Sequence, residues 1–257
     1  MRAKMKMENS KINGLFWGLA LAISALFTAC GSDSSSGAVN GGVNSKTAWD
    51  YLNPNVTYGE ITDPRDGQVY KTVSIGTQTW MAENLNYADS IPMPDLAGNS
   101  WCYGNRADSC AKYGRLYSWT ASMNIASSYQ SASASAVILS PHQGACPAGW
   151  HIPTNTEWTT LVDFVGGEET AGTKLKSRKG WVNNGNGTDA YGFSALPAGR
   201  RDCEGALFIY GGLRADFWSA TCDTDCAYYQ DSYYYFSASR RDRDYEKEAF
   251  SVRCVKD

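Results

Sequence analysis

The chain has 257 residues, a formal charge of −3 and a 13 % share of aromatic residues, which includes 16 tyrosines. An acidic chain of this kind has no basic stripe for phosphate backbones, so we do not expect it to bind nucleic acid. Beyond its N-terminal segment the length suits one domain of about 200 residues, which can bury a core of its own.

The N-terminal segment has the order of a lipoprotein signal peptide. Four basic residues between Arg2 and Lys11 precede an uncharged apolar run over residues 15–27, which is too short to span a membrane. Small residues stand directly before Cys30, as in the lipobox that lipoprotein signal peptidase reads. We therefore expect residues 1–29 to be removed and Cys30 to carry lipid; the alternatives are an ordinary signal peptide or a buried helix. Removal of four basic residues and one acidic residue takes the charge from −3 to −6.

Residues 30–48 are expected to form a flexible tether. The stretch over 31–43 is rich in glycine and serine and lacks core-forming side chains. Gly31 follows the lipidation site, so no inner-membrane retention signal is evident. We expect an envelope protein held in the outer membrane through its lipid, with surface exposure left open, and a single domain over residues 49–257.

Besides the lipidated Cys30 the mature chain keeps seven cysteines, and an oxidising compartment favours disulfides over metal thiolates. Cys102 and Cys110 enclose a short polar loop, which predicts a local disulfide. Cys222 and Cys226 have the spacing of a short loop closure, which predicts a second one. An odd number leaves at least one cysteine free or paired between chains. The histidines, His142 and His151, have no nearby Cys-x-x-Cys, so no metal site is predicted.

Strand and helix signals alternate along the domain. Residues 68–75 and 79–85 are predicted to form a hairpin around the turn 76–78. A helix is predicted from Thr154, because Thr154 and Glu157 have the spacing of a capping box and the apolar side chains that follow recur at helical spacing. A second helix is predicted over 169–175. Strands are predicted over 193–196, 217–221, 227–237 and 251–255.

Several motifs together carry a family resemblance. The collinear segments are YKTVSIGTQTWMAENLNY, CAKYGRLYSW, CPAGWHIPTNTEWTTLVDFVGG, AGTKLKS, DAYGFSALPAGRR, FWSAT and SVRCVKD. From about residue 59 to its end, the chain resembles the Fibrobacter succinogenes major paralogous domain, a family of exported and lipid-anchored bacterial proteins.

A second, more remote resemblance is to the formylglycine-generating, sulfatase-modifying fold. It rests on residues 152–158 and 251–254. This resemblance implies an α+β, C-type-lectin-like architecture: a small antiparallel sheet, two helices and long disulfide-bearing loops. Chain ends lie close together in that architecture, which implies a Cys146–Cys254 disulfide. The reactive cysteine pair and copper site of the formylglycine enzyme have no matching motif here, so no cofactor is expected.

No recognisable catalytic constellation stands in the sequence, since serine-hydrolase, phosphate-loop and zinc-protease motifs are all missing from it. Three function classes follow. The first is a non-catalytic surface module that binds polysaccharide or an envelope partner; the second is an outer-membrane scaffold; the third is an enzyme with an unrecognised site. Trp181 stands beside a polar loop, and it is the tryptophan we expect at a ligand-binding surface, with a packing role in the core as the alternative.

Overall fold

The computed structural model describes residues 47–257 except 205 and 224–225, together with the side chains of all of these but Cys226. The predicted signal peptide, Cys30 and most of the predicted tether therefore lie outside the described residues. Residues Asn44–Asp257 make one compact unit, which holds both disulfides and the whole hydrophobic core described below. Within the described residues, no helix is both long enough and apolar enough to cross a membrane.

The first of two sheets joins the start of the domain to its end. Its five strands lie in the order β1 (Gly59–Thr62), β2 (Val69–Ile75), β3 (Gln78–Met81), β13 (Val255–Lys256) and β6 (Trp150–His151). The hairpin of β2 and β3 confirms the predicted one, and Gly76 has the positive φ of 61° that its tight turn requires. β13 pairs with β3, so the last strand closes against one of the first.

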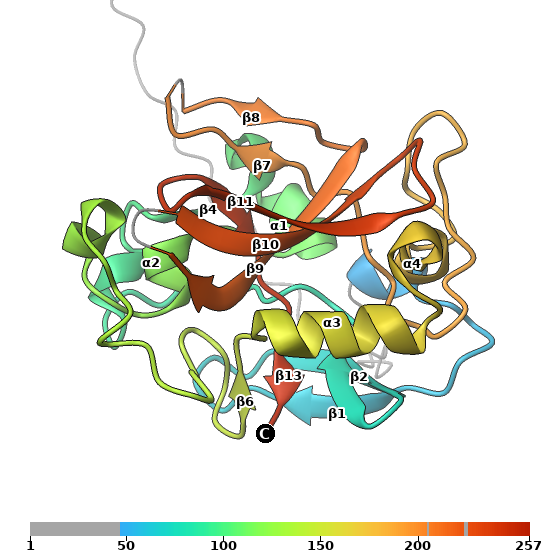
Figure 1. The fold of residues 1–257 in the computed structure, drawn as a ribbon, viewed down its shortest axis with the longest axis horizontal. Helices are drawn as coiled ribbons and strands as arrows, with labels where there is room; N and C mark the ends of the chain where they lie inside the picture. The colour runs from blue at the N-terminus through green and yellow to red at the C-terminus, as the bar shows by residue number, and fades with distance from the viewer. Residues whose placement is uncertain (1–46, 205, 224–225) are drawn as a thin grey trace, which may run out of the picture. The chain divides into compact units, whose positions relative to one another are not determined.

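The second sheet has eight strands and carries the candidate site. Six follow the order β11 (Ser239–Tyr245), β10 (Cys226–Tyr233), β9 (Arg214–Cys222), β12 (Ala249–Ser251), β5 (Leu116–Ser118) and β4 (Ser100–Trp101). The short β7 (Arg200–Arg201) pairs with β12 and with β8 (Phe208–Ile209). The pairs are antiparallel except for β12 with β9. The strands β9, β10 and β11 form the broad ribbon seen in Figure 1.

The helices are short. α3 (Asn155–Phe164) begins at the predicted capping box, in which Thr154 and Glu157 each accept a backbone N–H from the other. α4 (Glu168–Leu175) confirms the second predicted helix. The other helices are α1 (Ala107–Tyr113) and α2 (Trp119–Ser122), with 3-10 turns η1 (Thr47–Tyr51), η2 (Pro94–Leu96), η3 (Tyr103–Asn105) and η4 (Ser127–Ser131). α3 lies between β9 and the smaller sheet in Figure 1.

The described part of the chain is thus mixed α and β with mainly antiparallel sheets. The predicted single small sheet is wrong, because the chain divides its strands between two sheets. The predicted strand over 193–196 is also not formed: Ala195 makes only an isolated bridge to Lys176. The predicted closing strand divides as well, since β12 ends at Ser251 in one sheet and β13 begins at Val255 in the other.

Two of the predicted disulfides are present. Cys102 is bonded to Cys110, and Cys146 is bonded to Cys254 across a separation of 108 residues. The predicted Cys222–Cys226 disulfide is wrong, because Cys222 is a free cysteine. The sheet register explains this result: at the end of β9, Cys222 stands opposite Ala227 of β10 and not opposite Cys226.

Candidate functional site

An exposed aromatic turn joins β10 to β11. Tyr235 is 59 % exposed and Phe236 is 40 % exposed, and their ring centroids lie 4.2 Å apart. Tyr234 packs its ring edge-on to Tyr235 at 4.8 Å, and Tyr233 packs edge-on to Phe236 at 6.0 Å. The predicted strand over 227–237 ends at Tyr233, so the residues that follow form a surface instead of a strand.

A cavity of about 220 Å³ opens directly beside this turn. It is lined by Asp231, Tyr233, Phe236, Arg240 and Asp242, with Ala238 and Arg241 completing its wall. The β10–β11 register sets Asp231 opposite Arg240, and opposite partners in a pleated sheet project from the same face. The cavity therefore combines aromatic surface, carboxylate acceptors and a guanidinium donor.

Asp231 is the most buried charged group of this cavity. One carboxylate oxygen accepts the backbone N–H of Arg240 at 3.2 Å, and the other accepts a guanidinium N–H of Arg214 at 3.2 Å. Burial raises the pKa of Asp231 to about 6, against the opposing charge of Arg214. The carboxylate is therefore ionised at neutral pH and becomes a hydrogen-bond donor in mild acid.

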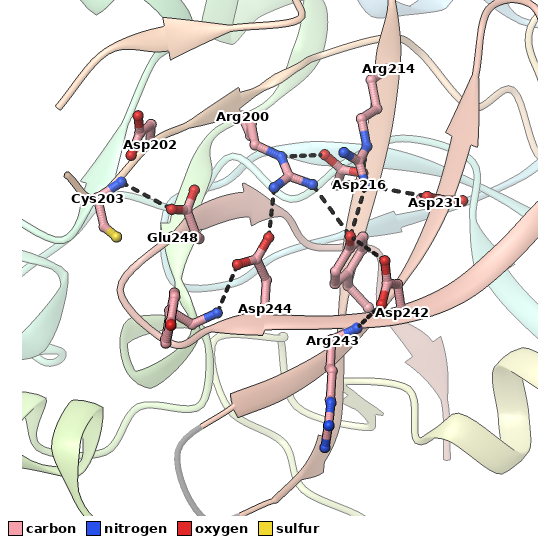
Figure 2. Close-up of polar contacts among 12 residues, drawn as sticks. Arg200, Asp202, Cys203, Arg214, Asp216, Asp231, Asp242, Arg243, Asp244 and Glu248 are labelled. Carbon is pink, nitrogen blue, oxygen red and sulfur yellow. Dashed lines mark hydrogen bonds and ion pairs between the residues drawn. The ribbon is translucent and has the colours of Figure 1, made fainter. Parts of the chain in front are cut away.

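A buried ion network extends from Asp231 of this cavity (Figure 2). Asp216 is fully buried and accepts hydrogen bonds from Arg214 at 2.6 Å and from Arg200 at 3.0 Å. Arg200 reaches on to Asp244 at 2.7 Å, and the Tyr229 hydroxyl lies 2.7 Å from Arg214. Each buried charge has partners, so the network fixes the relative positions of β7, β9, β10 and β11.

Lys176 holds the aromatic turn from behind. Its ammonium donates to the carbonyl oxygens of Tyr233 at 3.0 Å, Tyr234 at 3.3 Å and Phe236 at 2.9 Å. Burial lowers the pKa of Lys176 to about 8, so the charged form that these carbonyls bind prevails at neutral pH. Three bonds to one cation thus fix the backbone of the turn that presents these rings.

Two neighbouring loops extend the apolar surface. The backbone N–H of Tyr234 donates to Leu213, and that of Val182 donates to Gly212. Tyr210 and Val182 are both exposed on these loops. The turn, the loop at 210–213 and the loop at 182–187 therefore lie side by side.

Trp181 does not lie at the surface. It is 5 % exposed, and its indole N–H donates to Ser177 Oγ at 3.2 Å and to the Ala195 carbonyl at 3.1 Å. The prediction of an exposed Trp181 platform is wrong, because the ring fills the core beneath α4 and the Lys176 ammonium lies over it at 5.2 Å. The signal that sequence reasoning missed is Ser237 directly after the aromatic run Tyr233–Phe236, since serine is favoured in turns.

A possible metal-binding group lies at the edge of the same sheet. One ligand atom each from Asp202, Cys203 and Glu248 fall within 4.8 Å of one another (Figure 2). Burial and the neighbouring Glu248 raise the pKa of Cys203 to about 11, so the thiol is protonated at neutral pH. The backbone N–H of Cys203 already donates to Glu248. Metal binding here would release the thiol proton, so any affinity of the group for a metal ion would rise with pH.

A further cavity of about 340 Å³ is lined in part by Arg253, Asn84 and Glu83. Arg253 is buried and donates to Asn84 Oδ1 and to the carbonyl oxygens of Met81 and Phe193. Burial lowers the pKa of Arg253 to about 9. These bonds join the segments at 81–84 and at Phe193 to the C-terminal segment that contains Arg253, so we assign Arg253 a structural role.

Fold and site define a class: a mixed α/β domain with two disulfides and an exposed aromatic surface next to a polar cavity. The family model of the Fibrobacter succinogenes major domain matches residues 73–256, and the chain belongs to this family. The resemblance seen in the sequence motifs is thereby confirmed. Neither the comparison with curated proteins nor the comparison with solved structures gives a match.

Proposed function

We propose that this protein is a lipid-anchored envelope module, without catalytic activity, that binds polysaccharide through its aromatic turn. The observation that carries the proposal is the pair of exposed rings, Tyr235 and Phe236, beside the cavity that contains Asp231 and Arg240. A sugar ring has an apolar face and a hydroxyl edge. The aromatic pair suits the face, while carboxylate and guanidinium groups suit the edge.

The fold that we propose for this role is C-type-lectin-like. Pairing of β13 with β3 and β6 supports it, because this brings the chain ends of the domain together. The Cys146–Cys254 disulfide that the resemblance implies supports it as well. The long irregular connection over residues 177–199 also fits the long loops that the resemblance implies.

Attachment to the outer membrane is the second part of the proposal. It is supported by the basic, apolar and small-residue order that ends at Cys30 and by the glycine- and serine-rich stretch that follows. An anchored module of this kind would hold a polysaccharide or an envelope partner at the cell boundary. A scaffold role is the alternative, and it requires no glycan.

The test is a depletion assay with the compact unit, residues 44–257, on insoluble cellulose, other plant polysaccharides and peptidoglycan. We expect selective retention that the double variant Tyr235→Ala/Phe236→Ala loses. The matched control is Tyr245→Ala, because Tyr245 is also 59 % exposed but lies at the far end of β11. Wild-type protein that is retained on no material would contradict the glycan role and favour the scaffold.

One observation favours a second candidate, a glycoside hydrolase. Asp231 and Asp242 line the same cavity as diagonal neighbours on adjacent strands, and Asp231 has a pKa of about 6. A carboxyl group with a raised pKa beside a second carboxyl group is an arrangement that glycoside hydrolysis uses. Release of reducing ends by wild-type protein, abolished by Asp231→Asn, would establish this candidate in place of simple binding.

A further inference from the structure

A third cavity, distinct from the two described above, lies between η1 and the segment that follows α4. It has a volume of about 590 Å³, within the roughly 300–1,000 Å³ range of small-molecule sites. Apolar walls come from Leu52, Pro54 and Val56, and the cationic side comes from Arg178 and Lys179. The pocket is separate from the cavity beside the aromatic turn, which shares none of these residues.

Positive charge converges on this pocket. The Lys179 ammonium lies 5.4 Å from the ring centroid of Tyr51, and the Lys112 ammonium lies 4.6 Å from the same centroid. Arg178 donates from Nη1 to Asn53 Oδ1 at 3.2 Å. That bond uses one of the five N–H donors of a guanidinium and leaves others for a ligand.

The acidic groups nearby are few. Asp50 on η1 lines the pocket and is exposed. Glu83 accepts the indole N–H of Trp49, so it is engaged with the protein. The buried Asp189 carboxylate interacts with the charge of Arg178, and it already accepts the backbone N–H and the hydroxyl of Ser194. Among the ion pairs of the described residues, none involves Arg178, Lys179 or Lys112. On a chain whose net charge is negative, this group of cations is a local exception.

We propose that the pocket is a second saccharide site, specific for a sugar that carries a carboxylate. A guanidinium binds a carboxylate through two parallel hydrogen bonds, and a lysine adds a point charge. The apolar wall suits the face of the ring that bears the acid, which an inorganic anion does not offer. The ligand class is therefore a uronic acid residue of an acidic polysaccharide.

The chain itself links this pocket to the aromatic turn. Lys176 binds the turn, and Lys179, three residues further on, lines the pocket. The Cα atoms of these two lysines therefore lie at most about 11 Å apart, so one short segment of the chain contributes to both sites. The inference rests on the proposed glycan function and adds the substrate class to it.

The experiment measures binding of trigalacturonate and cellotriose by calorimetry to residues 44–257. Wild-type protein is expected to bind the acidic sugar at least tenfold more tightly, with a preference that falls as salt rises. Arg178→Gln/Lys179→Gln is expected to lose this tenfold preference and to bind cellotriose unchanged. The control Lys247→Gln/Lys256→Gln, which removes the same charge from two other exposed positions, is expected to bind like wild type.

Three outcomes would overturn the inference. They are equal affinity for the two sugars, loss of the preference in the control variant as well, or equally effective competition by inorganic phosphate, which marks a simple anion site. If cellotriose binding also proves independent of Tyr235 and Phe236, it is the proposed function that fails. The two failures are therefore distinguishable in one set of titrations.

Discussion

The ammonium of Lys176 lies 2.9 Å from the carbonyl oxygen of Phe236, so a buried cation next to α4 fixes an exposed turn of the larger sheet. The same cation lies over the ring of Trp181. Lys176 thus contacts both the buried Trp181 and the exposed aromatic turn. The residues that hold the turn can be tested separately from those that it presents.

Lys176→Met is expected to loosen the aromatic turn. Three carbonyl oxygens lose their donor, and a cost of about 2 kcal/mol in the free energy of unfolding follows from leaving such groups unpaired. Glycan retention should fall with it, and Lys176→Arg should restore part of both. Lys174→Met is the control, since Lys174 donates to Val165 and not to the turn. Full retention by a folded Lys176→Met protein would contradict the positioning role.

Trp181→Ala is expected to unfold the protein at lower denaturant concentrations and not to remove binding selectively. Truncation of a buried tryptophan leaves a cavity and costs about 3–5 kcal/mol. Equilibrium denaturation measures this loss. A variant with wild-type stability and no glycan retention would instead restore Trp181 as a contact residue.

The free energy of unfolding is expected to fall as the pH rises from 5 to 8. Burial raises the pKa of Asp189 to about 6, so the folded state holds a proton that the unfolded chain, with a pKa of about 3.9, has released. For His151, burial opposes the change, but hydrogen bonds to Glu157 and Asp257 raise the pKa above its usual value. That stabilisation is present below pH 6.5 and is lost as pH rises through the folded pKa.

Asp189 and His151 therefore both make the folded state less stable as the pH rises, and the melting temperature should be higher at pH 5 than at pH 8. Asp189→Asn removes one of them, so its melting temperature should change less over this range. A wild-type protein that becomes more stable toward pH 8 would contradict these assignments.

Reduction should affect the two disulfides unequally. The Cys146–Cys254 bond closes a loop of about 108 residues, and loops of that length correspond to about 4–5 kcal/mol on a chain-entropy estimate. The Cys102–Cys110 bond closes a loop of eight residues and should contribute about 2–3 kcal/mol. Denaturation of Cys146→Ser/Cys254→Ser and of Cys102→Ser/Cys110→Ser compares them, and a larger loss in the second variant would count against this ranking.

Local signals predicted the parts of the fold that depend on nearby residues. The capping box at Thr154 and Glu157 marks the start of α3, and the glycine turn at Gly76 marks the β2–β3 hairpin. The loop between Cys102 and Cys110 is short enough for its disulfide to be read from spacing. In each case the partners stand within ten residues of each other.

Features that depend on distant partners were not predictable in this way. Whether Trp181 is buried depends on Ser177 and Ala195 accepting its N–H, which no local pattern shows. The division into two sheets depends on β13 pairing with β3, strands some 170 residues apart. Cys222 stays free because of its register against β10, and register is a property of the assembled sheet.

The candidate site shows the same limit. Arg214, Asp216 and Asp231 come from two strands and meet only through the sheet register. The mixed-charge run at 240–248 is typical of a solvated hairpin end before the last strand, yet Asp244 within it accepts a hydrogen bond from the buried Arg200. Only the aromatic run before Ser237 offered a sequence signal for the exposed surface.

The most direct test of the central claim is a depletion isotherm for residues 44–257 on the panel of insoluble glycans, with wild type, Tyr235→Ala/Phe236→Ala and Tyr245→Ala side by side. All three should melt at similar temperatures, because the replaced rings are exposed. Saturable retention of wild type and Tyr245→Ala, with at least tenfold weaker retention of the double variant, is the predicted result. Equal retention of all three proteins, or retention of none, would contradict glycan binding at the aromatic turn.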